Sequence, residues 1–233
     1  MIIAIDGPAG SGKSTVAQIL AQRLGLLMLN TGAMYRAVGV TCLAQGVDLD
    51  DSQACSRVAA GLDLEVDGHG RLLSRGQVVD MDGLIGEEQG AAASQVGQLP
   101  AVRTVLVDAQ RRVGEKWDLV TEGRDTTTVV FPAAEYKFFL TASLEERAKR
   151  RHSQLRSHKD LQGLMADIEK RDRNDSEREA SPLSQAADAH AVNTDGLSID
   201  QVVDRLFALI APASGAQEGG SEGKRTQRGQ PSE

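Results

Sequence analysis

Short apolar runs, several of them rich in β-branched side chains, recur along this chain and are separated by segments whose apolar residues repeat every three or four positions. Continuous apolar runs of this kind are typical of strands buried on both faces of a parallel sheet. The runs that predict strands lie at residues 2–5, 26–29, 119–122, 137–141 and 189–193. The helical patterns between them are typical of βαβ units. We therefore predict an α/β protein with three layers built around a five-stranded parallel sheet.

The same pattern predicts where several helices begin and end. Apolar residues from Val16 to Leu24 recur at helical spacing, and Gly25 is predicted to end that helix. Two later helices are predicted to begin with capping boxes, at Ser143 and at Ser198.

A long stretch separates the second predicted strand from the third. It spans about 90 residues, which is too long for a simple crossover connection. Within it, residues 62–66, 71–73 and 77–79 form short apolar or alternating runs with glycine-containing turns between them. This pattern predicts a small three-stranded antiparallel sheet inserted into the domain. A helix over 101–114 is predicted to return the chain to the parallel sheet.

A glycine-rich segment joins the first predicted strand to the first predicted helix. It fits the phosphate-binding pattern G-x-x-x-x-G-K-[ST], through Gly7, Pro8, Ala9, Gly10, Ser11, Gly12, Lys13 and Ser14, and Thr15 follows it. In such a P-loop, backbone N–H groups and the helix dipole point toward one bound anion. Lys13 is expected to reach the β- and γ-phosphates of a nucleotide, and Ser14 to bind Mg²⁺. A glycine-rich turn without a ligand is the alternative interpretation.

Composition narrows the range of partners. The 233 residues carry a net charge of −7, the pI is about 5.2, and aromatic residues make up 3%. These values argue against general nucleic-acid binding. No apolar run reaches the length of a membrane span. Cys42 and Cys55 lack metal-ligand spacing, so we expect reduced core thiols, as in a cytoplasmic protein. We also expect a monomer. Apolar periodicity ends near residue 211, which predicts one domain over 1–211 and a disordered tail over 212–233.

Polar clusters follow two of the predicted strands, at the end where parallel sheets bind ligands. Tyr35 and Arg36 come shortly after the second strand, and Glu122, Arg124 and Asp125 come at the end of the third. Glu122 is placed to hold Mg²⁺, and the planar guanidinium of Arg124 to bind a phosphate through two hydrogen bonds. The alternatives are a solvated Arg36 after a helix cap and a surface ion pair of Arg124 with Asp125.

Two further clusters are rich in arginine. Arg147 and Arg151 are four residues apart and so share one face of a predicted helix. Arg171, Asp175 and Arg178 are spaced to share a face of a later helix. Each cluster taken alone is also compatible with a solvated helix face. Phosphoryl transfer accounts for both clusters together with the P-loop, because its transition state spreads negative charge over three oxygens that cations must surround.

Seven segments make the chain up to about residue 211 resemble the bacterial cytidylate kinases, a family of nucleoside monophosphate kinases. They are IDGPAGSGKST from Ile5, LNTGAMYRA from Leu29, ASQVGQLPAVR from Ala93, EGRDTTTVVFP from Glu122, SLEERAKRR from Ser143, KRDRNDSEREASPL from Lys170 and NTDGLSIDQVV from Asn193. P-loops serve many functions, whereas EGRDTTTVVFP and the charged run ending in SPL are much more specific.

The resemblance implies phosphorylation of CMP or dCMP by ATP with Mg²⁺, and it implies a role for each matching residue. The acceptor phosphate would be held by Tyr35, Arg36, Arg124 and Arg178. The cytosine edge would be read by Ser94, Arg103 and Asp125, and Thr31 would support the pocket. The ribose would be held by Arg171 and Asp175. The transferring phosphoryl group would meet Lys13, Arg124, Arg178 and, from a lid over about 147–178, Arg147 and Arg151. The inserted sheet, over about 57–100, would belong to the acceptor-binding region.

Three positions depart from the family's pattern. Thr127 stands where the family usually has glycine, Glu122 stands where aspartate is commoner, and Asn30-Thr31 replaces a commoner Asp-Ser.

Two rival functions stay open at this stage. One is a P-loop kinase for another monophosphate or small acceptor. The other is a P-loop NTPase that acts as a switch, for which Asp67-Gly68-His69-Gly70 fits a D-x-x-G pattern. That segment falls in a predicted turn of the antiparallel sheet, and no N-K-x-D motif occurs in the sequence.

Overall fold

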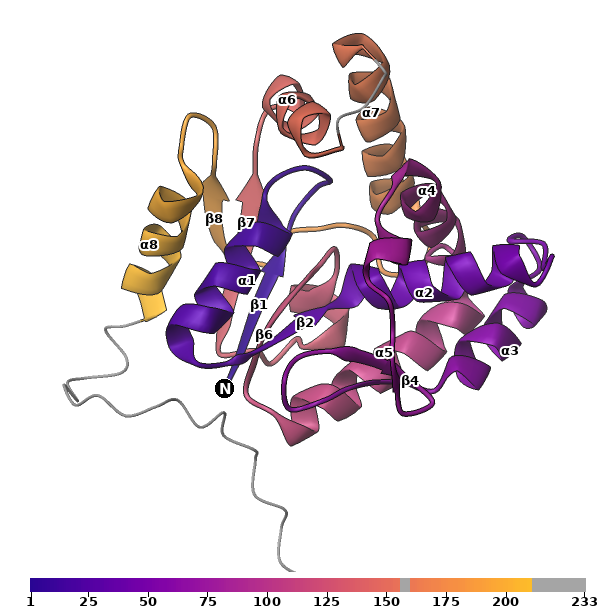
Figure 1. Ribbon diagram of the computed structural model, residues 1–233. Coiled ribbons are helices and arrows are strands. Elements are labelled where there is room, and N and C mark those ends of the chain that lie inside the picture. Colours follow the sequence, from indigo (N-terminus) through magenta and orange to yellow (C-terminus); the bar gives the residue numbers. More distant parts are fainter. Residues whose placement is uncertain (156–159, 211–233) are drawn as a thin grey trace, which may run out of the picture.

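The computed structural model describes residues 1–155 and 160–210, so the tail predicted over 212–233 lies outside the described residues. A five-stranded parallel sheet runs through the centre in the order β2-β6-β1-β7-β8 (Figure 1). Its strands are β1 (Ile2–Asp6), β2 (Leu27–Asn30), β6 (Leu119–Gly123), β7 (Tyr136–Thr141) and β8 (His190–Asn193). The predicted parallel sheet is confirmed, because each strand begins and ends within a residue of a predicted apolar run.

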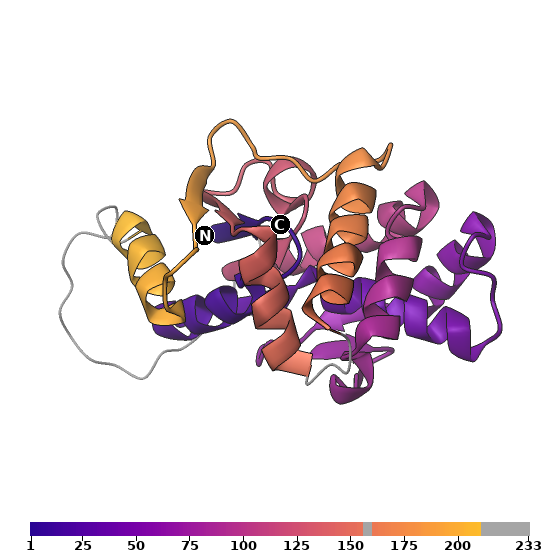
Figure 2. The ribbon, with the colours of Figure 1, turned by 90° about the horizontal axis from the view of Figure 1, so that it is seen from above.

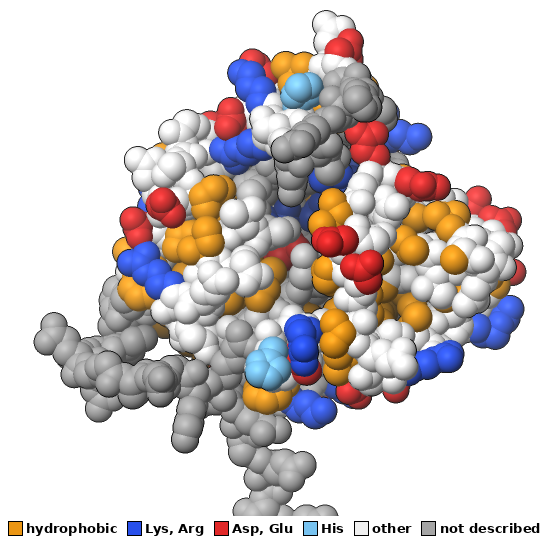
Figure 3. Space-filling model, in the orientation of Figure 1, with side chains coloured by type: hydrophobic (Ala, Val, Ile, Leu, Met, Phe, Trp, Pro, Cys, Tyr) orange, Lys and Arg blue, Asp and Glu red, His pale blue; other side chains and the backbone are white. Residues whose placement is uncertain are grey.

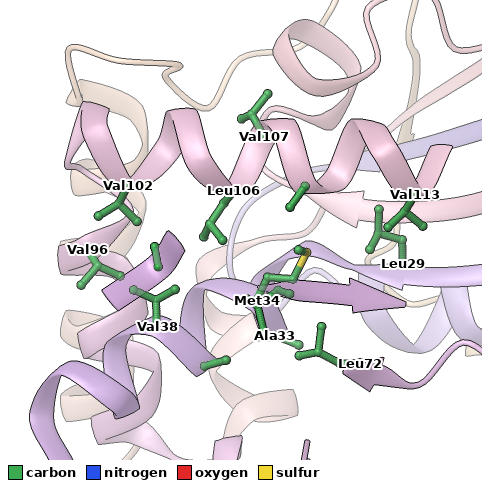
Figure 4. Close-up of a cluster of buried hydrophobic side chains, with 14 of the residues drawn as sticks. Leu29, Ala33, Met34, Val38, Leu72, Val96, Val102, Leu106, Val107 and Val113 are labelled. Atoms are coloured by element: carbon green, nitrogen blue, oxygen red, sulfur yellow. The ribbon is translucent and has the colours of Figure 1, made fainter. Parts of the chain in front are cut away.

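Helices cover both faces of this sheet and give the three predicted layers. On one face, α1 (Lys13–Leu24) and α8 (Ile199–Ile210) bury the apolar side chains of β1 and β7. On the other face lie α2 (Thr31–Ala44), α3 (Ser52–Leu62), α4 (Glu87–Val96) and α5 (Pro100–Lys116). Figure 4 shows this second core, where Met34 and Val38 of α2 face Val102 and Leu106 of α5. None of the described helices is long and apolar enough to cross a membrane.

The predicted antiparallel insert is also present. It consists of β3 (Leu64–Val66), β4 (Leu72–Ser74) and β5 (Gln77–Val78), followed by the short helical turn η1 (Asp82–Leu84). The first strand is shorter than predicted, because α3 continues to Leu62 and Asp63 then takes a left-handed φ of 45°. The strand therefore begins only after this reversal of the backbone.

Helices α6 (Leu144–Leu155) and α7 (Leu161–Glu177) form a pair at the top of the molecule. Seen from above, they lie side by side, and α7 lies next to α4 (Figure 2). Ala148, Leu164 and Ile168 form a small apolar cluster between them, separate from the two main cores. The pair is thus held together by its own contacts.

The two predicted capping boxes differ. At Ser198 both halves form, since Gln201 N donates to Ser198 Oγ at 3.2 Å and Ser198 N donates to Gln201 Oε1 at 2.9 Å. At Ser143 only the hydroxyl half forms, and the prediction of a reciprocal box there is wrong. The Ser143 N–H donates to Asp195 instead, and the Glu146 carboxylate accepts from Arg150 Nε at 2.9 Å. The Glu146 side chain therefore binds Arg150 and not the backbone N–H of Ser143.

The two cysteines are buried and free, as predicted. Burial raises the pKa of the Cys42 thiol to about 12, and the neighbouring Cys55 thiol acts in the same direction. The folded protein therefore keeps the Cys42 proton at pH values where an exposed thiol loses it.

We expect this thiol to make the protein less stable as the pH rises above about 9. The unfolded chain then releases the Cys42 proton while the folded chain keeps it, so the folded state binds more protons and loses stability with rising pH. Urea unfolding under reducing conditions at pH 8 and pH 10 measures the effect. The native protein should lose about 1–2 kcal/mol more than Cys42→Ala between these pH values. Equal losses would contradict the assignment.

Candidate active site

The carboxyl ends of β1, β2 and β6 meet at a cleft of about 990 Å³. The strands end level with one another, because Asp6 pairs with Gly123 and Asn30 pairs with Glu122. The cleft is also lined by residues of the P-loop, α2, α4, α5, α6 and α7. Figure 3 shows Lys and Arg side chains deep in a hollow below the top of the molecule. The predicted clusters at the strand ends therefore do converge.

The P-loop occupies the turn between β1 and α1. Gly7 is required there because a Cβ at this position would lie 2.0 Å from the carbonyl oxygen of Leu140 in β7. Gly10 has a φ of 78°, and a Cβ there would press against Arg147 at 3.0 Å. The loop is thus packed between β7 and α6.

Lys13 points back into this loop. Its Nζ donates to the carbonyl of Pro8 at 2.7 Å. Burial lowers the pKa of Lys13 to about 7, and the positive charge of Arg124 adds to this effect. A bound anion would oppose both influences and favour the charged lysine.

Oxygen atoms of Ser14 and Glu122 meet at the mouth of the loop. Ser14 Oγ donates to Glu122 Oε1 at 3.0 Å, and Thr31 Oγ1 donates to the Glu122 carbonyl at 2.8 Å. Both side-chain oxygens suit Mg²⁺, which prefers hard oxygen ligands and usually keeps water or phosphate as further ligands. Within the described residues, no cluster of three or more Asp, Glu, His or Cys side chains is arranged to hold a metal. A cation here would depend on a bound nucleotide for its remaining ligands.

The Asp125 side chain contacts Arg103 and Arg178, and it does not pair with Arg124, its neighbour in the sequence. It forms a buried ion pair with Arg103, and its second oxygen is 3.5 Å from Arg178. Burial raises the pKa of Asp125 on balance, although both arginines act to lower it. The alternative of a surface pair with Arg124 is therefore wrong.

Arg124 pairs with α7 instead. Its Nε donates to Asp175 Oδ2 at 2.8 Å, and Asp175 is buried. Burial lowers the pKa of Arg171 to about 10, and the positive charge of Arg124 contributes. Arg178 follows the end of α7 in an extended conformation, and its Nε donates to the Ser181 carbonyl. This charged run faces the cleft, so the alternative of a solvated helix face is wrong here.

Several buried polar atoms in the cleft have no hydrogen-bond partner within the described structure. They are Arg178 Nη2, just after α7, and, on the helices themselves, Tyr35 OH, Ser94 Oγ, Arg103 Nε and Arg171 Nε. Buried polar groups are normally paired, because leaving one unpaired costs free energy. Four such atoms on four different helices, all lining one cleft, point to a polar ligand that supplies the missing partners.

The structure separates the two lid arginines that the sequence placed together. Arg151 lines the cleft with Arg36, and burial followed by repulsion from Arg36 lowers the pKa of Arg151. Arg147 does not line the cleft. It forms an ion pair with Asp172 and donates to the Ala9 carbonyl at 3.0 Å. Asp172 in turn accepts from the Ala9 N–H at 3.1 Å.

Several residues of this region were missed by sequence reasoning. Asp172 was hidden in a run of charges, and nothing in that run distinguishes the residue that reaches the P-loop. Arg150 stands between the two predicted arginines and donates to Thr194 Oγ1 at 2.9 Å. Asp6 is fully buried at the end of β1. Asp6 could have been predicted as a site residue, because it is a charged residue at the end of an apolar strand, directly before the P-loop.

A P-loop between a buried strand and a helix, opening on a cleft lined by arginines, defines a P-loop phosphotransferase. Residues 3–212 match the family model described as cytidylate kinase, and the chain belongs to this family.

Individual relatives agree with the family match. The cytidylate kinase of Pseudomonas fluorescens SBW25 is 45% identical over 90% of this chain and 95% of its own length. That of Azotobacter vinelandii is 44% identical over 91% and 95%, respectively. A bifunctional pantoate ligase/cytidylate kinase of Synechococcus elongatus is 48% identical over 89% of this chain and 41% of its own. Among solved structures, a gluconokinase from Sinorhizobium meliloti 1021 has a TM-score of 0.46 at 16% identity over 91% of each chain, too low to carry an argument.

We expect Asp172→Ala to speed amide hydrogen exchange at Ala9 in the nucleotide-free protein. The substitution removes the carboxylate that accepts from this N–H, and hydrogen bonds to charged groups are worth enough to predict an increase of roughly tenfold. NMR-detected exchange gives the measurement, with Glu169→Ala, an exposed residue on the same helix, as the matched control. Equal exchange at Ala9 in the two variants would show that Asp172 does not protect this amide.

Proposed function

We propose that this protein transfers the γ-phosphoryl group of ATP to CMP or dCMP, giving ADP and CDP or dCDP. The family and its relatives support this activity. The observation that carries the proposal within this chain is the position of Asp125. It lies in the same cleft as the P-loop and beside Arg103, and the unpaired hydroxyl of Ser94 also lines that cleft.

The donor nucleotide is assigned to the P-loop. Its backbone N–H groups would surround the phosphates, with Lys13 beside the β- and γ-phosphates. Ser14 and Glu122 would hold Mg²⁺, which would neutralise charge on the transferring group when bound. Release of Lys13 from the Pro8 carbonyl would let its ammonium group face that charge.

The acceptor phosphate is assigned to the arginines around α2 and β6. Burial and the nearby Arg124 lower the pKa of Arg36, and Arg151 faces Arg36 across the cleft. A phosphate between these groups would offset their mutual repulsion. Tyr35 OH and Arg178 are placed to complete this site.

The base is assigned to Asp125, Arg103 and Ser94. Cytosine offers an exocyclic amine that donates and a ring nitrogen and carbonyl that accept. The Asp125 carboxylate can accept from the amine, while Arg103 Nε and Ser94 Oγ can donate to the other atoms. Uracil reverses the first two of these groups, so the same site would leave partners unpaired.

The remaining assignments concern regions of the chain. Arg171 and Asp175 are proposed to hold the ribose, Thr31 to support the pocket, and residues 57–100 to belong to the acceptor-binding region. Residues 147–178 are proposed to form a lid, which the separate apolar cluster between α6 and α7 supports. The two free thiols are consistent with action in a reducing cytoplasm.

The rival switch function is not favoured. Its D-x-x-G match lies in the turn between β3 and β4, where Asp67 Oδ1 accepts from the N–H groups of His69 and Arg71 at 2.9 Å. The aspartate is therefore accounted for by the turn it stabilises.

An acceptor panel tests the proposal directly. ATP consumption should depend on CMP or dCMP and be much slower with UMP, dTMP or AMP. Lys13→Ala should lower kcat with CMP by roughly 10²–10³, the scale for losing one group that stabilises transition-state charge. ATP turnover that is independent of any acceptor would favour the switch, and a preference for another monophosphate would favour the rival kinase.

A pair of variants tests the reading of the base. Asp125→Asn keeps an acceptor for Arg103 but adds a donor that suits uracil, so the CMP-to-UMP ratio of kcat/KM should fall by roughly tenfold or more. Arg36→Met, which removes a phosphate contact away from Asp125, should lower kcat/KM for both acceptors by similar factors. A CMP preference that survives intact in Asp125→Asn would remove the base-reading role of this residue.

A further inference from the structure

One buried carboxylate beside the cleft is not explained by the assignments above. Asp6 has no exposed surface, and it ends β1 directly before the P-loop. Its Oδ1 accepts from Thr126 N at 2.9 Å and from Thr126 Oγ1 at 2.8 Å. Its Oδ2 accepts from Thr127 N at 2.7 Å and from Thr127 Oγ1 at 2.6 Å.

These four bonds use the whole accepting capacity of the carboxylate. An ionised aspartate has two oxygens and about four lone-pair sites, and all of its partners here belong to two adjacent residues. Within residues 1–155 and 160–210, no Lys or Arg forms an ion pair with Asp6. Two backbone N–H groups and two hydroxyls bind the carboxylate directly, more strongly than they would bind a neutral acceptor. At longer range its charge also acts to raise the pKa of Lys13, which burial lowers.

The two threonines open an unusual segment of backbone. Residues Thr126–Val130 form a π-helical turn, labelled η2, whose preceding residue is Asp125. The Asp125 side chain does not cap this turn. The carboxylate of Asp6 instead accepts from the first two N–H groups of the turn, those of Thr126 and Thr127. One of the two hydroxyls belongs to Thr127, the second residue of the turn.

Asp125 is thereby fixed from both sides. On the preceding side, Gly123 belongs to β6 and pairs in register with Asp6. A Cβ at Gly123 would lie 2.7 Å from the Thr126 methyl and 2.7 Å from Thr31 Oγ1, so the backbone is tightly packed there. On the following side, Thr126 and Thr127 are bound to Asp6. Arg124 and Asp125 lie between these two anchors and point to different partners, Asp175 and Arg103.

We propose that Asp6 is a positioning residue for acceptor recognition, which acts through Thr126 and Thr127 to fix Arg124 and Asp125. The kinetic part of this inference rests on the proposed function. The charge of Asp6 acts on Lys13 of the P-loop, but its four hydrogen bonds all go to η2. Removing one of these bonds while keeping the charge therefore affects the acceptor side of the cleft more than the donor side. The Thr127 hydroxyl makes this chain's anchor one hydrogen bond stronger than a glycine at that position allows.

The test removes the Thr127 hydroxyl without changing the shape of the side chain. Thr127→Val should raise KM for CMP by roughly three- to tenfold, the range expected for one hydrogen bond, and lower the CMP-to-UMP ratio of kcat/KM. KM for ATP should change by less than about twofold. Thr127→Ser keeps the hydroxyl and should restore both values. Asp6→Asn should act in the same direction and more strongly, because an amide cannot accept all four bonds.

Two results would overturn the inference. One is a rise in KM for ATP equal to that for CMP in Thr127→Val. The other is a lowered Tm with unchanged KM values and unchanged CMP-to-UMP ratio, which would leave Thr127 and Asp6 a purely structural role.

A second measurement needs no substrate and so separates this inference from the proposed function. In the nucleotide-free protein, Thr127→Val should shift the amide resonances of Arg124 and Asp125, and Thr127→Ser should return them. Shifts confined to residues 9–14 would refute the positioning role. If the amide shifts appear as expected but the native enzyme shows no preference for CMP, the proposed function fails and the positioning role stands.

Discussion

Positive charge crowded into one cleft is the constraint on which the arrangement of this molecule depends. Burial lowers the pKa of Lys13, Arg36 and Arg171, and repulsion from a neighbouring arginine adds to it at each of them. Arg124 behaves differently. Burial acts to lower its pKa, but Asp175 and Glu122 raise it on balance. The cleft thus contains one arginine, Arg124, whose charge is stabilised by carboxylates. It also contains Lys13, Arg36 and Arg171, whose charges a bound anion would stabilise.

The fold meets this constraint by drawing the balancing acids from separate elements. Glu122 lies near the end of β6, Asp125 follows that strand, and Asp175 and Asp172 lie one turn apart on α7. The acids therefore come from two parts of the fold, the end of β6 and one face of α7. The cores on the two faces of the sheet hold β6 in place, whereas α7 is held by its own apolar cluster with α6.

The layers of the fold could be predicted from the sequence because they depend on local patterns. Apolar runs marked the strands, and the glycine spacing of the P-loop marked the donor site. The three strands of the antiparallel insert could also be predicted, except for the residue at which α3 ends and β3 begins. At Ser198 the capping box was a reliable signal, and both of its hydrogen bonds form. At Ser143 a nearby arginine changed the outcome.

Pairings within the candidate site could not be predicted, because they join residues far apart in sequence. Arg124 and Asp125 are neighbours, yet one pairs with α7 and the other with α5. Arg147 and Arg151 share a helix face, but Asp172 of α7 pairs with Arg147, whereas Arg151 lies in the cleft with Arg36. Which acid meets which arginine depends on how α6 and α7 lie against the P-loop. A spacing of four residues says nothing about that packing.

Gly7 shows that the phosphate-binding loop is not a portable cassette. Its eight residues are recognisable in any sequence, but here only glycine fits at the first of them, because a Cβ would lie 2.0 Å from the Leu140 carbonyl oxygen of β7. Moving β7 outward to make room would disturb its pairing with β1 and β8. An engineer who grafted this loop onto another framework would have to bring with it a strand that begins more than 120 residues later in the chain. The unit that must be transplanted is a sheet with a loop on it, not a loop.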